Sequence, residues 1–511
     1  MLGLGAAALL RAQGGPVAKT AYGSVRGVHD PRGLEIFKGI PYARADRFRA
    51  PVPPTPWTGV RDAVKPGAVA PQNDDGAGIL AYSQSEDCLH LNVWTPALDR
   101  AKRPVLFYIH GGAHINGTGA SSALDGTNLV LNENVVVVTI NYRLGVLGYP
   151  PFPIFDNDAP RNLGLLDQVA ALRWVRDHIG EFGGDPGNVT VFGLSAGGWT
   201  TVALMVIPQA RGLFHRAAPE SPAFQIAANA DDQAVNAKAF LDAIGTDRPA
   251  KLVDAPVADL LRAQQATIDH QHASLLAHPE VEMRTFPFIP VQDSVVLKDD
   301  PIRLMEKGDG MRIPLFAGGT SAEIAACPFR MAVEWLAAMH DKARVLKSLE
   351  RVTTSAKAQS IYDGYVALRR GASEAEIGGF LRSDFQYRMP VVRTTEFHAR
   401  RNPTWMYDFD YSAPSPQIGI ATHAFDTAFW FGNIAISRLA GFFFGRAPNE
   451  AELGLSRMMQ RDLAAFARTG KCSWAAYRTE SRWTKVYSLP HSLIVSDPRA
   501  KERMLWDGVR L

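Results

Sequence analysis

Continuous apolar runs and one periodic helix pattern organise the first half of the chain. Val105–Ile109 and Val135–Ile140 consist almost wholly of apolar and β-branched residues, which is typical of central strands buried on both faces. Residues 163–181 instead carry apolar side chains at helical spacing and predict an amphipathic helix. The apolar positions of that helix are Leu165, Leu166, Val169, Leu172, Val175 and Ile179.

The next apolar run, Val189–Phe192, predicts a short buried strand that ends at Gly193. A helix can follow over residues 200–205. This order of strand, strand, helix, strand and helix predicts an α/β fold, in which helices flank a mainly parallel central sheet. The further elements we expect are paired short strands over 17–43 around a turn at 30–33, strands at Ile313–Gly318 and Thr404–Phe409, and a helix over 455–468.

The length of 511 residues allows about three average domains, but large α/β enzymes often form one unit with insertions. We expect a single α/β domain over residues 17–511, with helical cap insertions at about 223–285 and 325–400. Residues 1–16 include an apolar stretch followed by small residues, so we expect a signal remnant or a disordered N-terminus. A secreted or periplasmic location is slightly favoured, and a cytoplasmic one is the alternative.

The composition narrows the partners. The chain is 46% hydrophobic and 21% charged, with a net charge of +3 and no block of basic residues. Nothing therefore indicates binding to nucleic acid or to a membrane. Cys88, Cys327 and Cys472 are far apart and match no metal or disulfide spacing. We expect no metal or cofactor, a small-molecule substrate, and a monomer or weak homo-oligomer.

Residues Gly193–Gly197 form a Gly-x-Ser-x-Gly motif between a predicted strand and a predicted helix. This context is that of a nucleophile elbow, a strained turn that exposes the Ser195 hydroxyl. Side chains at Gly193 and Gly197 would clash in such a turn, and the Ala196 N–H can donate to an oxyanion. The motif alone is weak evidence in a chain with 44 glycines, and a glycine-rich loop with a buried serine is the alternative.

A serine hydroxyl needs a neighbouring histidine as base, and that histidine needs a carboxylate to orient it. On folds with this elbow, the acid and then the histidine follow the serine along the chain. His423 has this order and lies in the loop after the predicted strand Thr404–Phe409. His398, in a charged helix, and His491, in a polar tail, are expected at the surface.

The candidate acid is Glu323, which follows a predicted strand through a glycine-rich turn. Capping of the next helix is the alternative role for this side chain. His110–Ala113 follows the first central strand, and its small residues let backbone N–H groups approach a substrate oxygen. A simple glycine turn is the alternative there.

These residues lie within longer motifs that together resemble the type-B carboxylesterases, the family that includes cholinesterases and bacterial para-nitrobenzyl esterases. The likeness covers about residues 20–490. Its motifs are GIPYA at 39–43, EDCLHLNVW at 86–94, HGGA at 110–113, NYRLGVLG at 141–148, NLGLLDQVAALRWVRDHIGEFGGDP at 162–186, VTVFGLSAG at 189–197, GLFHRA at 212–217 and HAFDTAFWFG at 423–432.

The resemblance implies an α/β-hydrolase fold and a serine hydrolase that cleaves carboxylic esters through an acyl-enzyme. The implied roles are Ser195 as nucleophile, Glu323 as acid, His423 as base, Gly112, Ala113 and Ala196 as oxyanion-hole donors, Gly193 and Gly197 as elbow glycines, and Ser221 and Asp426 as supporting residues around the triad.

Some positions depart from the family pattern. Ala70 stands where relatives carry the cysteine that pairs with the equivalent of Cys88, so we expect Cys88 to be a free thiol. Leu194 replaces a glutamate before the nucleophile, and the loop 71–87 lacks the tryptophan that binds quaternary ammonium in cholinesterases. Tyr82 is a weak substitute. These changes favour neutral, apolar esters over choline esters.

Ala113 replaces the glycine of the third oxyanion position and narrows the approach to its N–H. Two alternatives to a general esterase stay open. One is a hydrolase of a specialised xenobiotic or natural-product ester or carbamate. The other is an adhesion-type member of the family without catalysis, which the complete set of triad residues and glycines disfavours.

Overall fold

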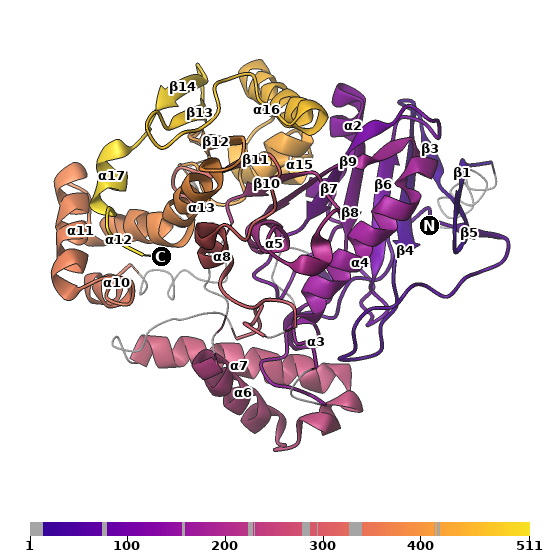
Figure 1. The fold of residues 1–511 in the computed structure, drawn as a ribbon, viewed down its shortest axis with the longest axis horizontal. Helices are drawn as coiled ribbons and strands as arrows, with labels where there is room; N and C mark the ends of the chain where they lie inside the picture. The colour runs from indigo at the N-terminus through magenta and orange to yellow at the C-terminus, as the bar shows by residue number, and fades with distance from the viewer. Residues whose placement is uncertain are drawn as a thin grey trace.

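The computed structural model describes residues 14–73, 79–155, 159–222, 228, 230–277, 287–293, 295–325, 340–412, 414–415 and 419–510. In this part of the chain, eleven strands form one sheet in the order β14-β13-β12-β11-β10-β9-β7-β8-β6-β4-β3. The strands are β3 (Val28–Asp30), β4 (Leu34–Pro41), β6 (His90–Thr95), β7 (Arg103–Ile109), β8 (Val136–Ile140), β9 (Gly184–Leu194), β10 (Arg216–Glu220), β11 (Leu315–Thr320), β12 (Thr404–Phe409), β13 (Trp483–Tyr487) and β14 (Leu493–Ser496). A smaller sheet of β1 (Val17–Thr20), β2 (Gly23–Arg26) and β5 (Val60–Asp62) lies beside it (Figure 1).

The seven strands from β8 to β13 pair in parallel, and the strands at both ends of the sheet pair antiparallel. The strands β9, β10, β11 and β12 are neighbours in that order. The carboxyl ends of parallel neighbours meet at one edge of a sheet, which is where α/β proteins place their sites. The predicted α/β fold with a mainly parallel sheet is confirmed.

Helices flank the sheet on both faces. They are α2 (Thr127–Glu133), α3 (Gly145–Gly148), α4 (Leu163–His178), α5 (Ala196–Leu204), α6 (Ala230–Ile244), α7 (Val257–Ala277), α8 (Pro301–Lys307), α10 (Lys342–Leu349), α11 (Ser355–Leu368), α12 (Glu374–Ser383), α13 (Met389–Ala399), α14 (Thr427–Phe431), α15 (Ser437–Phe444), α16 (Glu450–Thr469) and α17 (Ala500–Leu505). Figure 1 shows α4 and α5 in front of the sheet and α6 and α7 packed together away from it.

The alternation of side chains along β7 explains the two hydrophobic cores. Val105, Phe107 and Ile109 pack into the core that includes the apolar stripe of α4 and residues of α5. Leu106 and Tyr108 face the opposite core, formed with residues of α2, α14 and α16. Successive side chains of a strand point to opposite faces, so this continuous apolar run supplies both cores, as predicted.

Most predicted elements have their expected places, with altered ends. The predicted helix over 163–181 is α4, which ends at His178 and continues as a 3₁₀ turn, Ile179–Phe182. The helix predicted over 455–468 begins earlier, at Glu450, because Asn449 and Glu452 form a capping box. The C-terminal tail adds strands β13 and β14, which the sequence analysis did not predict.

The cysteine prediction is confirmed where the structure describes it. Cys88 is fully buried and Cys472 is half-buried, and both are free thiols. Cys327 and the apolar start of the predicted N-terminal segment, residues 1–13, lie outside the described residues. Among the helices that are described, none combines the length and apolar character that a membrane crossing requires.

A buried ion pair connects two of the sequence motifs. Arg143 donates from Nε and Nη2 to the carboxylate of Asp167 at 2.9 and 2.7 Å, and its backbone N–H donates to the same group at 3.0 Å. The side chains are 5% and 0% exposed. Arg143 also donates to the carbonyl oxygen of Arg49 at 2.7 Å. This pair fixes the loop after β8 to helix α4.

We predict that Asp167→Ala lowers the free energy of unfolding by about 3–5 kcal/mol, because it leaves the Arg143 guanidinium buried without a counter-charge. Urea unfolding followed by circular dichroism measures the change. Asp242→Ala is the matched control, since Asp242 pairs with Lys238 on the surface of α6 and its loss should cost at most about 1 kcal/mol. Equal, small losses in both variants would contradict the prediction.

Candidate active site

Ser195 occupies the turn between β9 and α5 with φ 58° and ψ −119°, a backbone conformation that residues with side chains rarely adopt. The turn is tight because the chain folds back against β7. A Cβ added at Gly193 would lie 2.5 Å from the carbonyl oxygen of Ile109, and one added at Gly197 would lie 2.0 Å from the same oxygen. Both positions therefore require glycine, and the strand–turn–helix context predicted for the elbow is present.

Glu323 lies in the turn after β11 and is 2% exposed. Its Oε1 accepts hydrogen bonds from the Ser221 hydroxyl at 2.7 Å and from the Thr320 N–H at 2.8 Å. Its Oε2 lies 2.5 Å from Nδ1 of His423, which is 8% exposed. The backbone N–H of His423 also donates to the backbone carbonyl oxygen of Glu323 at 2.8 Å. Hydrogen bonds thus hold both oxygens and the backbone carbonyl of Glu323.

The contact with Glu323 determines which nitrogen of His423 can act as a base. Donation from Nδ1–H to the carboxylate leaves Nε2 with its lone pair. The ring of Tyr387 packs on the imidazole with centroids 4.8 Å apart. Tyr387 lies in a π-helical turn, Asp384–Arg388, between α12 and α13. The imidazole is therefore fixed both by a hydrogen bond and by packing.

The elbow and the acid–base pair are joined through the end of β10. The Ser195 N–H donates to the carbonyl oxygen of Glu220 at 3.0 Å, and the next residue, Ser221, donates to Glu323. Within the described residues, the Ser195 hydroxyl makes no hydrogen bond to His423 in this conformation. Such contacts commonly tighten only in the substrate complex.

The loop after β7 approaches the nucleophile closely. A Cβ added at Gly111 would lie 3.0 Å from the Ser195 Cβ. Gly112 and Ala113 both have positive φ, of 114° and 52°. In the described part of the chain, the N–H groups of Gly112, Ala113 and Ala196 donate no hydrogen bond. Three such N–H groups beside a nucleophile can receive an oxyanion.

Two histidines in this loop have structural surroundings. Burial lowers the pKa of His110 to about 4 and that of His114 to about 3, so both are neutral near pH 7. His110 stacks on Tyr142 and bonds to the Gly111 carbonyl oxygen through Nδ1 at 2.8 Å. His114 Nε2 lies 3.3 Å from the hydroxyl of Thr200 on α5. These contacts support the loop and its approach to α5.

Three further polar residues differ in their burial. Asp426 is fully buried and accepts from the Tyr407 hydroxyl at 3.2 Å. His491 is exposed, as predicted. The prediction for His398 was wrong: it is 3% exposed and its Nε2 lies 2.7 Å from the Ile313 carbonyl oxygen. A position in a charged helix does not reveal which face that helix buries.

Sequence reasoning missed Glu220. It is the last residue of β10, it is 3% exposed, and its carbonyl oxygen holds the elbow. The signal available in the sequence was a carboxylate in an otherwise uncharged segment, Ala217–Ser221, since a buried carboxylate needs a specific partner.

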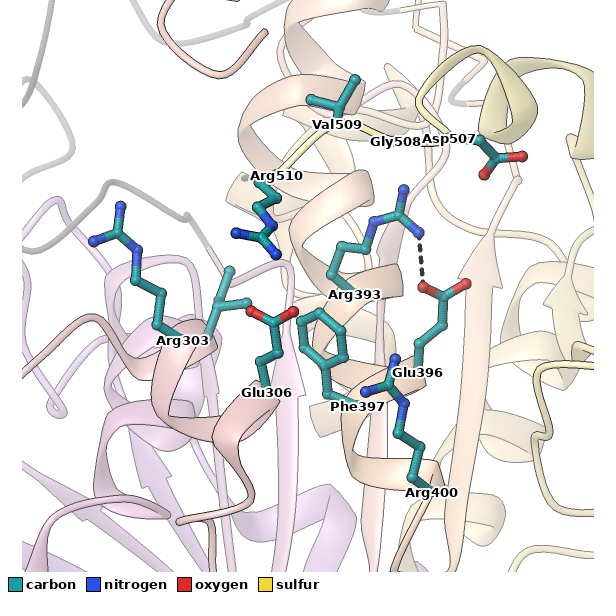
Figure 2. Close-up of a pocket in the computed structure, with 11 residues that line it drawn as sticks. Arg303, Glu306, Arg393, Glu396, Phe397, Arg400, Asp507, Gly508, Val509 and Arg510 are labelled. Atoms are coloured by element: carbon teal, nitrogen blue, oxygen red, sulfur yellow. Dashed lines mark hydrogen bonds and ion pairs between the residues drawn. The ribbon is translucent and has the colours of Figure 1, made fainter.

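A cavity of about 270 Å³ lies elsewhere, between α8, α13 and the C-terminal segment (Figure 2). Figure 2 shows its charged lining, including the ion pair of Arg393 with Glu396 at 2.8 Å. Among the described residues that line it there is no serine, histidine or cysteine, so it does not offer the serine and histidine that this type of ester hydrolysis uses. No group of three His, Cys, Asp or Glu among the described residues is arranged to hold a metal ion.

The comparisons with known proteins agree with this geometry. The family model for the carboxylesterase family matches residues 14–503. The chain is 34% identical to a para-nitrobenzyl esterase of Bacillus subtilis, covering 95% of this chain and 97% of that protein. It is 31% identical to carboxylesterase 1D of Rattus norvegicus, with coverages of 92% and 89%.

Solved structures give the same result. A thermophilic para-nitrobenzyl esterase superposes with a TM-score of 0.84 at 33% identity, covering 96% of this chain and 99% of that one. A carboxylesterase of Geobacillus stearothermophilus at pH 6.2 superposes with a TM-score of 0.81 at 32% identity and the same coverages. The fold and the elbow thus define an α/β-hydrolase of the serine ester hydrolase class. The chain belongs to the carboxylesterase family.

We predict that Gly319→Ala lowers kcat/KM by about 10- to 100-fold, because small displacements of catalytic groups have effects of this size. The added Cβ would lie 2.5 Å from Glu323 Oε1 and 2.9 Å from the Ser221 hydroxyl, so the carboxylate must move. Ester hydrolysis measures the loss, and thermal unfolding verifies the fold. Gly454→Ala, where nothing lies within 4 Å, is the control. Wild-type activity in Gly319→Ala would contradict the expectation that ester hydrolysis depends on the position of the Glu323 carboxylate.

Proposed function

We propose that this protein hydrolyses neutral, apolar carboxylic esters through an acyl-enzyme formed on Ser195. The observation that carries the proposal is the buried contact of 2.5 Å between Glu323 and His423, joined through β10 to a strained elbow. The family shares this class of reaction, whereas the individual residue roles and the ester preference are our proposal.

The proposed reaction has two halves. Ser195 Oγ attacks the ester carbonyl carbon while His423 Nε2 accepts its proton, and the oxyanion accepts hydrogen bonds from Gly112, Ala113 and Ala196. The tetrahedral intermediate then collapses, the bond to the alcohol oxygen breaks, and His423 returns the proton to that leaving group. In the second half, water attacks the acyl-enzyme, His423 accepts a proton from the water, and Ser195 leaves with that proton.

Three local features support a preference for neutral substrates. Leu194, which is partly exposed, places an apolar side chain before the nucleophile instead of a negative charge. The loop 71–87 contains no tryptophan. The Tyr82 hydroxyl donates to the Ala120 carbonyl oxygen at 3.0 Å. Nothing in this set matches the aromatic face and negative charge that attract a quaternary ammonium.

A specialised substrate is the second candidate. One relative that is 31% identical over 95% of this chain is named phenmedipham hydrolase, from Pseudarthrobacter oxydans. The same machinery would cleave a xenobiotic or natural-product ester or carbamate, so this candidate differs in substrate and not in mechanism. The adhesion-type alternative is disfavoured because the acid–base contact and the elbow geometry are both intact.

We also propose that residues 17–511 form one domain with helical insertions, since strands from Val28 to Ser496 join a single sheet. The proposed partner is a small-molecule ester, and the proposed state is a monomer or weak homo-oligomer.

We predict that Ser195→Ala lowers kcat for para-nitrophenyl butyrate by at least about 10³-fold, because no other group in the elbow can form the acyl-enzyme. A fluorophosphonate probe should label the wild-type protein at Ser195 and leave the variant unlabelled. Circular dichroism verifies that the variant is folded. Retained turnover in Ser195→Ala, or a wild-type adduct at another residue, would refute the proposed nucleophile.

We predict that the protein prefers 3,3-dimethylbutyl butyrate over butyrylcholine by about tenfold or more in kcat/KM. The two esters have nearly the same shape and differ in a positive charge, so their ratio isolates the cost of taking that charge out of water into a site that offers it neither an aromatic face nor a carboxylate. Titration of the released butyric acid measures both rates. An equal or reversed preference would overturn the assignment to neutral esters.

A further inference from the structure

Two carboxyl groups lie buried behind the acid–base pair, and the reaction described above uses neither. Glu220 ends β10 and Asp426 immediately precedes α14. Their exposed fractions are 3% and 0%, and their side chains are in hydrogen-bonding contact with each other. Two ionised carboxylates in contact at such a dry site would repel each other strongly, so contact requires a proton between them.

The hydrogen-bond partners leave one oxygen of each carboxyl free to take part in sharing that proton. The Thr427 hydroxyl donates to Glu220 Oε1 at 2.5 Å, and the Tyr407 hydroxyl donates to Asp426 Oδ2 at 3.2 Å. The second oxygens, Glu220 Oε2 and Asp426 Oδ1, are buried and accept no hydrogen bond from any described residue. A carboxylic acid O–H on one member that donates to the other satisfies both oxygens at once.

Burial, followed by the charge of Asp426, raises the pKa of Glu220 well above its usual range. Burial, followed by the charge of Glu323, raises the pKa of Asp426 to about 6. Glu220 is therefore the member that holds a proton more tightly, and Asp426 is the member that ionises first. Each of these shifts agrees with one shared proton and one negative charge.

The groups that face Glu220 and Asp426 determine which neighbour the negative charge of the pair can stabilise. Tyr108 of β7 and Tyr407 of β12 adjoin them, and burial raises the pKa of both phenols, so both are neutral. Glu323 and His423 are the titratable neighbours on the other side. The groups that face His423 itself are Glu323, Asp426 and the Tyr387 ring. Among these neighbours, the protonated imidazole is the one that a negative charge stabilises.

We propose that Glu220 and Asp426 share one proton and act as a positioning pair, whose single negative charge stabilises the protonated form of His423. The pair adjoins the machinery on two sides, because the Glu220 carbonyl oxygen accepts a hydrogen bond from the Ser195 N–H and the charge of His423 acts on Asp426, three residues later in the chain. The proposal rests on the proposed function only in that His423 is the general base.

A shared charge has a consequence that a fixed charge lacks. In Glu220→Gln, the amide N–H donates to Asp426 in place of the acid proton, and Asp426 carries the charge. In Asp426→Asn, the amide N–H donates to Glu220, which becomes the ionised member. Only Glu220→Gln/Asp426→Asn removes the charge, while its two amides can still hydrogen-bond to each other. The double variant therefore removes the negative charge of the pair without removing the hydrogen bond between its two side chains.

The test is the pH profile of kcat/KM for para-nitrophenyl butyrate in the wild type, both single variants and the double variant. We expect each single variant to keep the pKa of the acid limb within about 0.5 unit. In the double variant, loss of the charge disfavours imidazolium, so the acid limb moves to lower pH by about one unit or more. The plateau falls by up to about tenfold, the factor that corresponds to one pKa unit.

Asp462→Asn is the matched control. Asp462 is a carboxylate with a pKa raised by burial, and it accepts from the Tyr487 hydroxyl at 2.8 Å. It lies on α16 and is not among the groups that act on His423 or on the pair, so its profile should match the wild type. An unchanged profile in the double variant, or single-variant shifts that simply add, would overturn the proposal.

Infrared difference spectroscopy tests the shared proton without the double variant. The wild type at pH 8 should show a neutral carboxyl stretching band that Glu220→Gln lacks, and absence of this difference would overturn the proposal. Failure of the pair is distinguishable from failure of the proposed function. If Ser195→Ala is inactive and unlabelled while the double variant is unchanged, the esterase assignment stands and the pair does not.

Discussion

The buried contact between Glu323 and His423 is the interaction on which the site depends. At 2.5 Å and with Glu323 2% exposed, it orients the imidazole and favours the tautomer that carries its proton on Nδ1. A carboxylate at this depth would be costly without donors. The Ser221 hydroxyl and the Thr320 N–H provide them on the other oxygen, so the carboxyl group stays oriented although it is removed from water.

The sheet topology brings these groups together from distant parts of the sequence. Ser195, Glu220, Glu323 and His423 follow or end β9, β10, β11 and β12, and these strands are parallel neighbours. One edge of the sheet therefore collects the proposed nucleophile, its backbone anchor, and the proposed acid and base. Successive side chains of β7 enter opposite cores, and a one-residue slip of the strand would move each side chain into the wrong core.

Much of this arrangement was predictable from local signals. The glycines around Ser195, the central strands and the helix α4 follow from steric and periodic patterns that each segment carries by itself. Glu323 was harder, because a glutamate after a strand also suits a helix N-terminus, and only its contact with His423, a hundred residues later, separates the two roles. The burial of His398 and the strand β13 depend on which neighbour covers them, and that information is not local. Glu220 was missed for the same reason, since its partners Thr427 and Asp426 lie more than two hundred residues away.

Backbone strain collects where these side chains meet. Six non-glycine residues of the site have positive φ: Ala113, His114, Ser195, Ser221, Glu323 and Ala424. Each such conformation costs on the order of 1–3 kcal/mol, and it persists only where the surrounding structure determines it. Here the surroundings are the strand ends of a sheet buried on both faces, with the elbow pressed against β7 and the acid turn bonded to the histidine loop. A rigid scaffold of this kind holds the proposed oxyanion donors and nucleophile in place before the substrate arrives, so the proposed reaction requires little reorganisation of the protein. The strain and the large core are thus linked, because the stability of the buried sheet offsets the free-energy cost of the strained conformations at the site.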